Sequence, residues 1–237
     1  MLFRSGRPYW WIWVIFVFPA LGSVVYAIVE VLPEFRRGPA FAWGSWFKSR
    51  QRRIRELRER LAETDTVNTR LELAAELAAA RRFEEAYAVL YECLTGVFRD
   101  DPHLLLEAAR LLLQMDKGPE ALDVLNQVRV ERDKWLEMKR SLLKGWALQC
   151  VGQLAEAETM LRSLAAIFPG DEPRYRLGLV LLARGRKEEA AGLFEDIIQK
   201  FRKAGPAWRR AEREWFRLAK ARLKELRIRL ALQGRTQ

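Results

Sequence analysis

Four short turn signals recur along this chain at a nearly constant interval. Each ends in an alanine that follows charged residues, and the intervals between these alanines are 35, 36 and 33 residues. A period of about 34 residues is typical of a unit made of two antiparallel helices. Neither helix of such a unit can bury its apolar stripe alone, so neighbouring units stack. The sequence therefore predicts an array of four helix pairs, whose turn alanines are Ala86, Ala121, Ala157 and Ala190.

Two further positions of this repeat have a fixed character. When the turn alanine is numbered 20, position 8 is always small and position 24 is always bulky. Small residues at positions 8 and 20 let the two helices approach closely, and the bulky residue fills the space beside them. The residues at position 8 are Ala74, Ala109, Gly145 and Gly178, and those at position 24 are Leu90, Leu125, Leu161 and Phe194.

On these positions the chain resembles the tetratricopeptide repeat family over 66–203. The resemblance implies a right-handed α-solenoid, with repeats at about 67–100, 102–135, 138–170 and 171–203. Two departures from the family pattern are Lys144 at an apolar position and Gly118-Pro119 at the second turn. We expect locally imperfect packing there and not a different fold.

An apolar run, YWWIWVIFVFPALGSVVYAIVEVL, occupies residues 9–32 after a short tail at 1–8. About 20 apolar residues suffice for a helix that crosses a bilayer, so we expect a transmembrane helix here. A cleaved secretory signal is the alternative, although such a signal usually has a shorter apolar core and a small-residue cleavage site. More basic residues follow the run than precede it. Because basic residues stay on the cytoplasmic side, we expect a single-pass protein of a bacterial inner membrane with a cytoplasmic C-terminal domain.

The same run contains the pattern W-x-W-x-x-x-x-x-P-x-x-G-x-x-x-Y, formed by Trp11, Trp13, Pro19, Gly22 and Tyr26. This pattern resembles the second helix of the membrane hairpin that precedes phospholipase D-type enzymes such as cardiolipin synthases. The first helix of that hairpin is absent, either because it was lost or because the natural start lies upstream. The enzyme signature H-x-K-x-x-x-x-D is absent as well. The resemblance therefore implies an anchor without the enzyme.

The chain carries a net charge of +11, which favours a negatively charged neighbour. For an anchored protein, anionic lipid is the first candidate and nucleic acid is a less favoured one. Two basic helices concentrate the charge, one in a juxtamembrane linker at 33–65 and one in the final segment at 204–237. The predicted lipid or phosphate surface consists of Lys48, Arg50, Arg52, Arg53 and Arg55 in the linker and of Arg213, Arg217 and Arg227 in the final segment.

Each basic helix also has an apolar stripe, which leaves two interpretations open for each. We expect the linker helix to lie on the membrane surface, and the alternative is a stalk or a helix packed on the first repeat. We expect the final helix to cap the solenoid, because a terminal repeat needs a polar cover. Its alternative role is to bind anionic lipid or nucleic acid.

The side chains that catalysis and metal binding need are scarce. The chain has one histidine, His103, and its two cysteines, Cys93 and Cys150, form no CxxC motif. It contains neither a G-x-x-x-x-G-K-[ST] loop nor a G-x-G-x-x-G loop. We therefore expect no enzyme, no cofactor and no metal site, and the cysteine spacing fits a reducing compartment.

In tetratricopeptide repeats the first helix of each pair lines a concave groove. The chaperone-binding members hold a carboxylate with Lys and Asn at two positions of the first repeat, where this chain has Leu71 and Ala75. We therefore expect an apolar groove in place of a carboxylate clamp, with Trp146 and Tyr175 as anchors, because aromatic residues are frequent binding hot spots. Several of these side chains could instead pack against the final capping helix or the linker. The predicted groove consists of Leu71, Leu106, Arg110, Gln114, Lys139, Leu142, Trp146, Gln149, Tyr175, Arg176 and Leu179.

These features predict an all-α, membrane-anchored interaction scaffold. We expect its solenoid to bind a peptide or helix of an unidentified protein partner that has apolar residues and some acid. Binding of anionic lipid or nucleic acid through the basic helices is the alternative. The sequence leaves the partner's identity and the oligomeric state open.

Overall fold

The computed structural model describes residues 50–233, which form eleven helices and no strand. The predicted tail, the predicted transmembrane helix and the first part of the linker, with Lys48, lie outside the described residues. None of the helices between residues 50 and 233 combines the length and the hydropathy that crossing a membrane requires. The all-α class is confirmed for the part of the chain that the structure describes.

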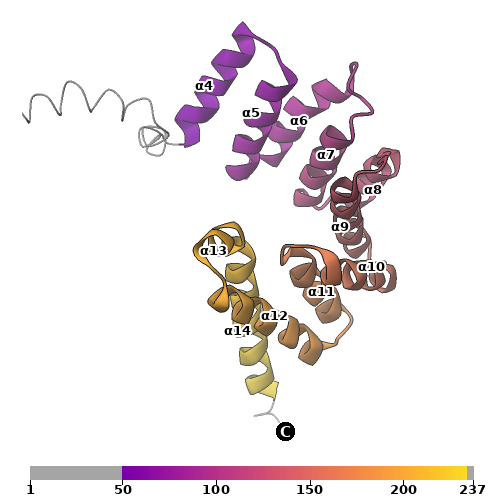
Figure 1. Ribbon diagram of the computed structural model, residues 1–237, viewed down its shortest axis with the longest axis vertical. Coiled ribbons are helices and arrows are strands. Elements are labelled where there is room, and N and C mark those ends of the chain that lie inside the picture. The colour runs from indigo at the N-terminus through magenta and orange to yellow at the C-terminus, as the bar shows by residue number, and fades with distance from the viewer. Residues whose placement is uncertain (1–49, 234–237) are drawn as a thin grey trace, which may run out of the picture. The chain divides into compact units, whose positions relative to one another are not determined.

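Eight of these helices form four consecutive pairs, and each helix packs against the one that follows it (Figure 1). The third pair begins at Lys134, ahead of the start predicted at 138. The pairs are α5 (Val67–Ala79) with α6 (Phe83–Leu94), α7 (Pro102–Gln114) with α8 (Gly118–Gln127), α9 (Lys134–Cys150) with α10 (Leu154–Ile167), and α11 (Glu172–Ala183) with α12 (Lys187–Lys203).

The turn inside each pair contains one residue with a left-handed backbone, always at position 15 of the repeat. The next residue donates its backbone N–H to a carbonyl five residues earlier, and this hydrogen bond is 2.9 Å long in all four pairs. It satisfies a carbonyl that the helix end would otherwise leave without a partner. The left-handed residues are Arg81, Asp116, Gly152 and Gly185, with φ of 62°, 59°, 82° and 80°.

Close packing explains the small residues of the repeat. A Cβ atom on Gly178 would lie 2.5 Å from Cε1 of Phe194, and one on Gly145 would lie 2.8 Å from Cγ of Leu161. Both contacts join position 8 to position 24, as the pattern predicted. Gly118 is buried for a similar reason, since its Cβ would lie 2.8 Å from Cβ of Cys150. The expected loose packing at the second turn was therefore wrong.

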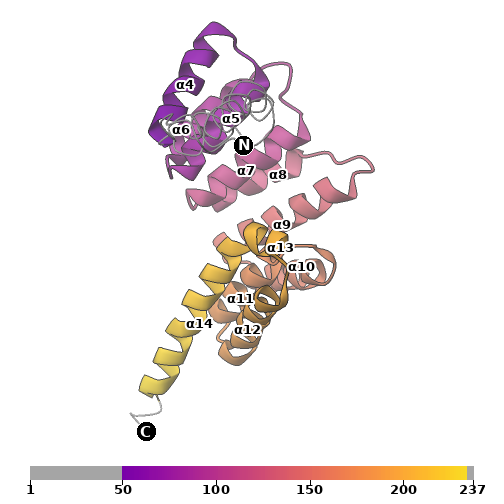
Figure 2. The same cartoon turned by 60° about the vertical axis from the view of Figure 1, so that its left-hand side comes forward.

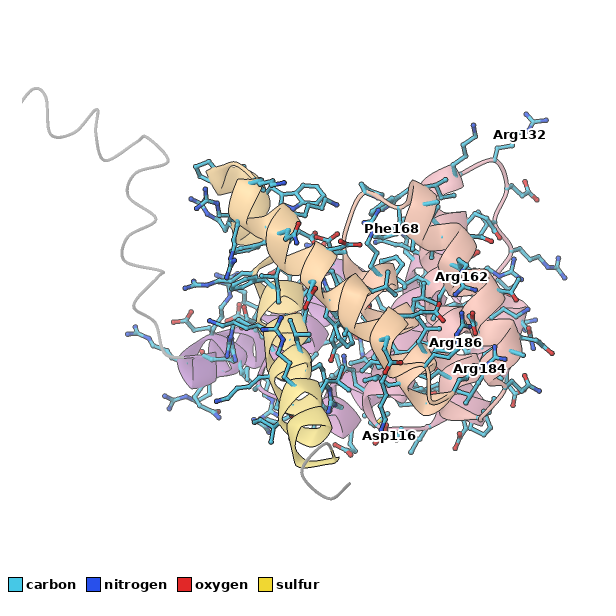
Figure 3. All side chains as sticks on the ribbon, turned by 90° about the horizontal axis from the view of Figure 1, so that it is seen from below. Asp116, Arg132, Arg162, Phe168, Arg184 and Arg186 are labelled. Carbon is cyan, nitrogen blue, oxygen red and sulfur yellow. The ribbon has the colours of Figure 1, made fainter. Side chains whose placement is uncertain are left out.

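A buried carboxylate ties the last two repeats together. Glu158 of α10 is only 3% exposed, and its carboxylate pairs with Arg162, Arg184 and Arg186. These three arginines gather in one place at the turn between α11 and α12 (Figure 3). Burial raises the pKa of Glu158, but the ion pairs with Arg186 and Arg162 outweigh it, so the pKa lies below its ordinary value. The carboxylate is therefore held in its charged form.

The linker helix, α4 (Arg50–Glu63), packs on the first repeat. Its apolar residues Ile54 and Leu57 are buried in the same core as Leu73 and Leu90. Apolar side chains that fill a protein core cannot also lie in a membrane surface. The expectation of an interfacial helix is therefore wrong for this stretch, and packing on the first repeat is the arrangement observed.

The final segment forms two helices where one was expected. α13 (Pro206–Ala211) ends just before Glu212, and α14 (Arg213–Gln233) follows beside α11 and α12 (Figure 2). The carboxylate of Glu212 accepts a hydrogen bond of 2.9 Å from the backbone N–H of Asp171, which fixes the break on the fourth repeat. α14 buries Ala219, Leu223 and Leu226, so it covers the end of the repeat array as predicted.

Candidate partner-binding groove

A cavity of about 470 Å³ opens between α5 and α7. Most of its lining is apolar, and three alanines on α5 leave the space open. Polar groups stand on α7 alone. This combination of an apolar floor and a few polar groups is typical of sites that bind a ligand or a partner side chain. The lining residues are Leu71, Ala74, Ala75, Ala78, Phe83, Leu90 and Leu111, with Glu107, Arg110 and Gln114 as the polar ones.

The local sequence explains why α5 and α7 direct their lining side chains into the cavity. Residues 71, 74, 75 and 78 follow the spacing that places side chains on one face of a helix. α7 starts with Pro102 after the cap residue Asp101, whose Oδ1 accepts hydrogen bonds from the N–H groups of His103 and Leu104. This cap fixes the start of α7 and therefore the direction in which its groove residues project.

The predicted groove is closed where the third and fourth repeats would line it. Cζ of Arg176 lies 3.2 Å from the ring centroid of Trp146, and its Nε donates a hydrogen bond of 3.1 Å to Glu172. Tyr175 is 5% exposed and lies between the rings of Phe194 and Trp215, with centroid distances of 5.7 and 5.6 Å. The chain itself therefore covers these side chains, and the prediction that Tyr175 and Arg176 are available to a partner was wrong.

Other predicted groove residues divide between core and surface. Leu106 and Leu142 are buried, because they fill the space between neighbouring pairs, so their prediction as contact residues was wrong. Lys139 lies over the ring of Trp135 at 5.6 Å, and Leu179 is half-buried. Gln149 is half-buried, and its Oε1 has no hydrogen-bond partner among the described residues. Of the predicted residues, the structure brings together Leu71, Arg110 and Gln114 around the α5–α7 cavity.

One ion pair connects this cavity to the closed part of the groove. Nη1 of Arg110 lies 3.7 Å from Oε2 of Glu172, the carboxylate that also pairs with Arg176. Burial lowers the pKa of the Arg176 guanidinium, and Glu172 acts in the opposite direction. Glu172 therefore serves mainly to compensate the buried Arg176. The longer contact leaves Arg110, whose side chain is 31% exposed, able to meet a second carboxylate at the cavity rim.

The residues of the predicted lipid or phosphate surface that the structure describes lie on two helices. Arg50, Arg52, Arg53 and Arg55 are exposed on α4. Arg213 and Arg217 are exposed on α14. Arg227 is also exposed on α14, and it pairs with Glu195 of α12 at 2.7 Å.

The described residues offer little chemistry outside this groove. Between residues 50 and 233, no three side chains of the His, Cys, Asp and Glu types are placed so that they could hold a metal ion. Burial raises the pKa of both thiols, Cys93 and Cys150, which keeps them protonated and weakly nucleophilic.

Sequence reasoning did not find most of the cavity lining. Ala74, Ala78 and Glu107 were absent from the predicted site, because the prediction relied on large and aromatic residues as anchors. The signal that was available is the run LELAAELAAA, which places alanines repeatedly on one helix face without bulky residues to fill the space.

Comparisons with known proteins bear on the fold. No known protein family matches the sequence, and no curated protein matches it. The solved structure of MamA from Desulfovibrio magneticus RS-1, from residue 41 to its end, gives a TM-score of 0.52 at 18% identity, covering 65% of this chain and 86% of that chain. A structure titled MamA RS-1 ArsTM double mutant gives the same values.

The fold is similar to that of MamA. At this level of identity the similarity to MamA shows the fold and carries no function with it. It agrees with a tetratricopeptide-like solenoid of helix pairs.

Proposed function

We propose that this protein is a non-catalytic scaffold that binds a short segment of a partner protein in the α5–α7 groove. The observation that supports the proposal is the cavity of about 470 Å³, with its alanine-lined floor and its polar groups confined to α7. Elsewhere on the predicted groove, the chain's own residues occupy the space in which a partner would lie.

The cavity indicates what the partner segment contributes. Ala74, Ala75 and Ala78 leave room for one or two large apolar side chains, and Arg110 favours an acidic residue beside them. Glu107, one turn before Arg110 on the same helix, disfavours a second acid beside it. We therefore expect a helix or peptide with apolar anchors and a single acidic residue at their side.

The proposal includes a membrane anchor formed by residues 9–32. The length and composition of this run support it. Fractionation of cells tests it: the full chain should be extracted from membranes by detergent and not by high salt. A shortened chain that begins at Arg50 should not sediment with membranes. Extraction of the full chain by salt alone would contradict the anchor.

Filling the groove tests the binding role. Ala75→Arg places a long charged side chain in the cavity, and Ala88→Arg places the same side chain on the exposed surface of α6. The intact protein is purified with its partners from its own cells, and bound proteins are quantified by mass spectrometry. We expect Ala75→Arg to lower the recovery of the partner about tenfold or more, which corresponds to about 1.4 kcal/mol. Ala88→Arg should leave it unchanged, and equal recovery with both variants would refute the proposal.

A further inference from the structure

A second groove lies between α12 and α14, away from the cavity between α5 and α7. The two helices run antiparallel, since Phe201 stacks on Phe216 at 4.1 Å while Arg227 pairs with Glu195 further along. A cavity of about 650 Å³ opens between them. Its lining consists of Glu195, Ile198, Gln199, Arg202, Lys220, Leu223, Lys224, Arg227 and Ile228.

The rim of this groove carries uncompensated positive charge. Arg227 and Glu195 neutralise each other. Arg202, Lys220 and Lys224 are exposed and have no ion-pair partner among residues 50–233. Three positive charges therefore border one short groove. A partner with carboxylates at matching positions would be attracted to it.

The floor of the groove is apolar. Ile198 and Leu223 lie at its base, and Ile228 is 51% exposed on α14. In the isolated chain, water therefore contacts the apolar side chain of Ile228 beside the unpaired cations. Covering this surface with an apolar side chain is favourable because it removes apolar area from water.

The shape of this groove favours a helix over a lipid surface. Its apolar residues lie between two helices, where a side chain can reach them, whereas a membrane-bound helix presents its apolar residues outward. The rim residues Lys220, Lys224 and Arg227 follow helical spacing along α14. A third helix laid along the groove would meet them at every turn.

We propose that the α12–α14 groove binds an acidic amphipathic helix of a partner protein. The apolar face of this helix covers Ile198 and Ile228, and its carboxylates pair with Arg202, Lys220 and Lys224. This binding is independent of the α5–α7 groove, so one protein can hold two partner segments at once.

The test uses the full chain and a fluorescein-labelled peptide of about 18 residues, which forms about five helical turns. Leucines occupy one face of the peptide, glutamates occupy the rest, and a scrambled peptide of the same composition serves as a control. Fluorescence anisotropy measures the Kd. We expect saturable binding of the patterned peptide and at least about tenfold weaker binding of the scrambled one.

Two matched pairs of variants locate the binding. Lys220→Glu with Lys224→Glu should raise the Kd about tenfold or more, whereas Arg213→Glu with Arg217→Glu makes the same charge change on α14 outside the groove and should raise it less than about twofold. Ile228→Ser should weaken binding, and Leu218→Ser, an exposed leucine of α14 outside the groove lining, should not. Thermal unfolding of each variant checks that it remains folded.

Four results would overturn the proposal. The first is absence of binding at millimolar peptide, and the second is equal binding of the scrambled peptide. The third is an equal loss of affinity in the two charge-reversal pairs. The fourth is displacement of the peptide by vesicles of phosphatidylcholine and phosphatidylglycerol but not by vesicles of phosphatidylcholine alone. The third result would indicate diffuse attraction to a basic surface, and the fourth would indicate a lipid site. The variant Ala75→Arg should bind the peptide normally, which separates this proposal from that of the α5–α7 groove.

Discussion

Arg176 lies over the ring of Trp146, with its Cζ atom 3.2 Å from the ring centroid. Both residues belong to the predicted binding groove. In the structure they contact each other and leave no space for a partner between them. Glu172 completes the arrangement through a hydrogen bond of 3.1 Å from Nε of Arg176. The contact joins the third repeat to the fourth, so side chains that could have bound a partner instead hold the solenoid together.

Removing the charge of Arg176 should destabilise the protein strongly. In Arg176→Met the buried carboxylate of Glu172 keeps, among residues 50–233, only the distant Arg110 as an ion-pair partner, and breaking a buried ion pair in this way costs about 3–5 kcal/mol. Urea unfolding measures the loss. The double variant Arg176→Met with Glu172→Met should recover most of it, because no unpaired charge remains. A double variant as unstable as the single one would show that packing on Trp146, and not charge, is the dominant contribution.

The contact between Gly178 and Phe194 predicts a large effect of one methyl group. Gly178→Ala places a Cβ atom 2.5 Å from Cε1 of the buried Phe194, and overpacking of this kind costs typically about 1–3 kcal/mol. Gly192→Ala is the matched control, since a Cβ there meets no atom within 4 Å on α12. Replacing an unconstrained helical glycine by alanine should instead stabilise the protein by about 0.5–1 kcal/mol. Destabilisation by both variants would contradict the close-packing account.

The repeated left-handed turn predicts a gain from glycine. Asp116 adopts φ of 59°, a conformation that costs a residue with a side chain about 1–2 kcal/mol. Glycine removes this cost, but its greater freedom in the unfolded chain offsets part of the gain. We therefore expect Asp116→Gly to raise the free energy of unfolding by about 1 kcal/mol. Gly185→Ala, at the equivalent position of the fourth repeat, should lower it. Thermal unfolding of both variants measures the two changes in stability. If both variants were stabilised, or both destabilised, the two turns would not be equivalent.

Glu158 predicts a specific dependence of stability on pH. Its pKa is lowered in the folded protein, so its contribution is present above the unfolded pKa and is lost as the pH falls through the folded pKa. Glu158→Gln should therefore lose less stability than the natural chain on acidification from neutral pH. Urea unfolding at a series of pH values measures this difference.

Glu212 provides a control of opposite sign. Burial raises its pKa, so its contribution falls as the pH rises through the interval between the unfolded and folded pKa values. Glu212→Gln should lose more stability than the natural chain on acidification. If both variants lost more stability on acidification than the natural chain, or both lost less, the opposite pKa shifts given to Glu158 and Glu212 would be wrong.

The repeat architecture could be predicted from the sequence because it depends on local and periodic features. The turn alanines and the small residues at position 8 report directly on helix approach, as the contact between Gly145 and Leu161 shows. The left-handed backbone of Arg81 and Asp116 could not be predicted from their residue types, because these types disfavour that conformation. The break at Glu212 depends on a hydrogen bond from the backbone N–H of Asp171, which is distant in sequence. Helical periodicity cannot reveal a contact of this kind.

The candidate site could be predicted only in part. Sequence reasoning placed residues on the correct helices, and Leu71, Arg110 and Gln114 do line the cavity. It could not show that Trp215 of α14 lies against Tyr175, because that contact depends on how the final helix packs. Aromatic residues suit a core as well as a binding surface, and their type alone does not separate the two.

Site-specific photo-cross-linking tests the central claim most directly. A photoreactive amino acid replaces Gln114 on the rim of the α5–α7 groove, or Gln127 on the exposed surface of α8 as the control. After irradiation of cells that make the full chain, we predict a discrete cross-linked partner from position 114 and none from position 127. The Ala75→Arg variant should abolish the cross-link at 114. The same product from both positions, or a product at 114 that persists in the Ala75→Arg variant, would contradict the account.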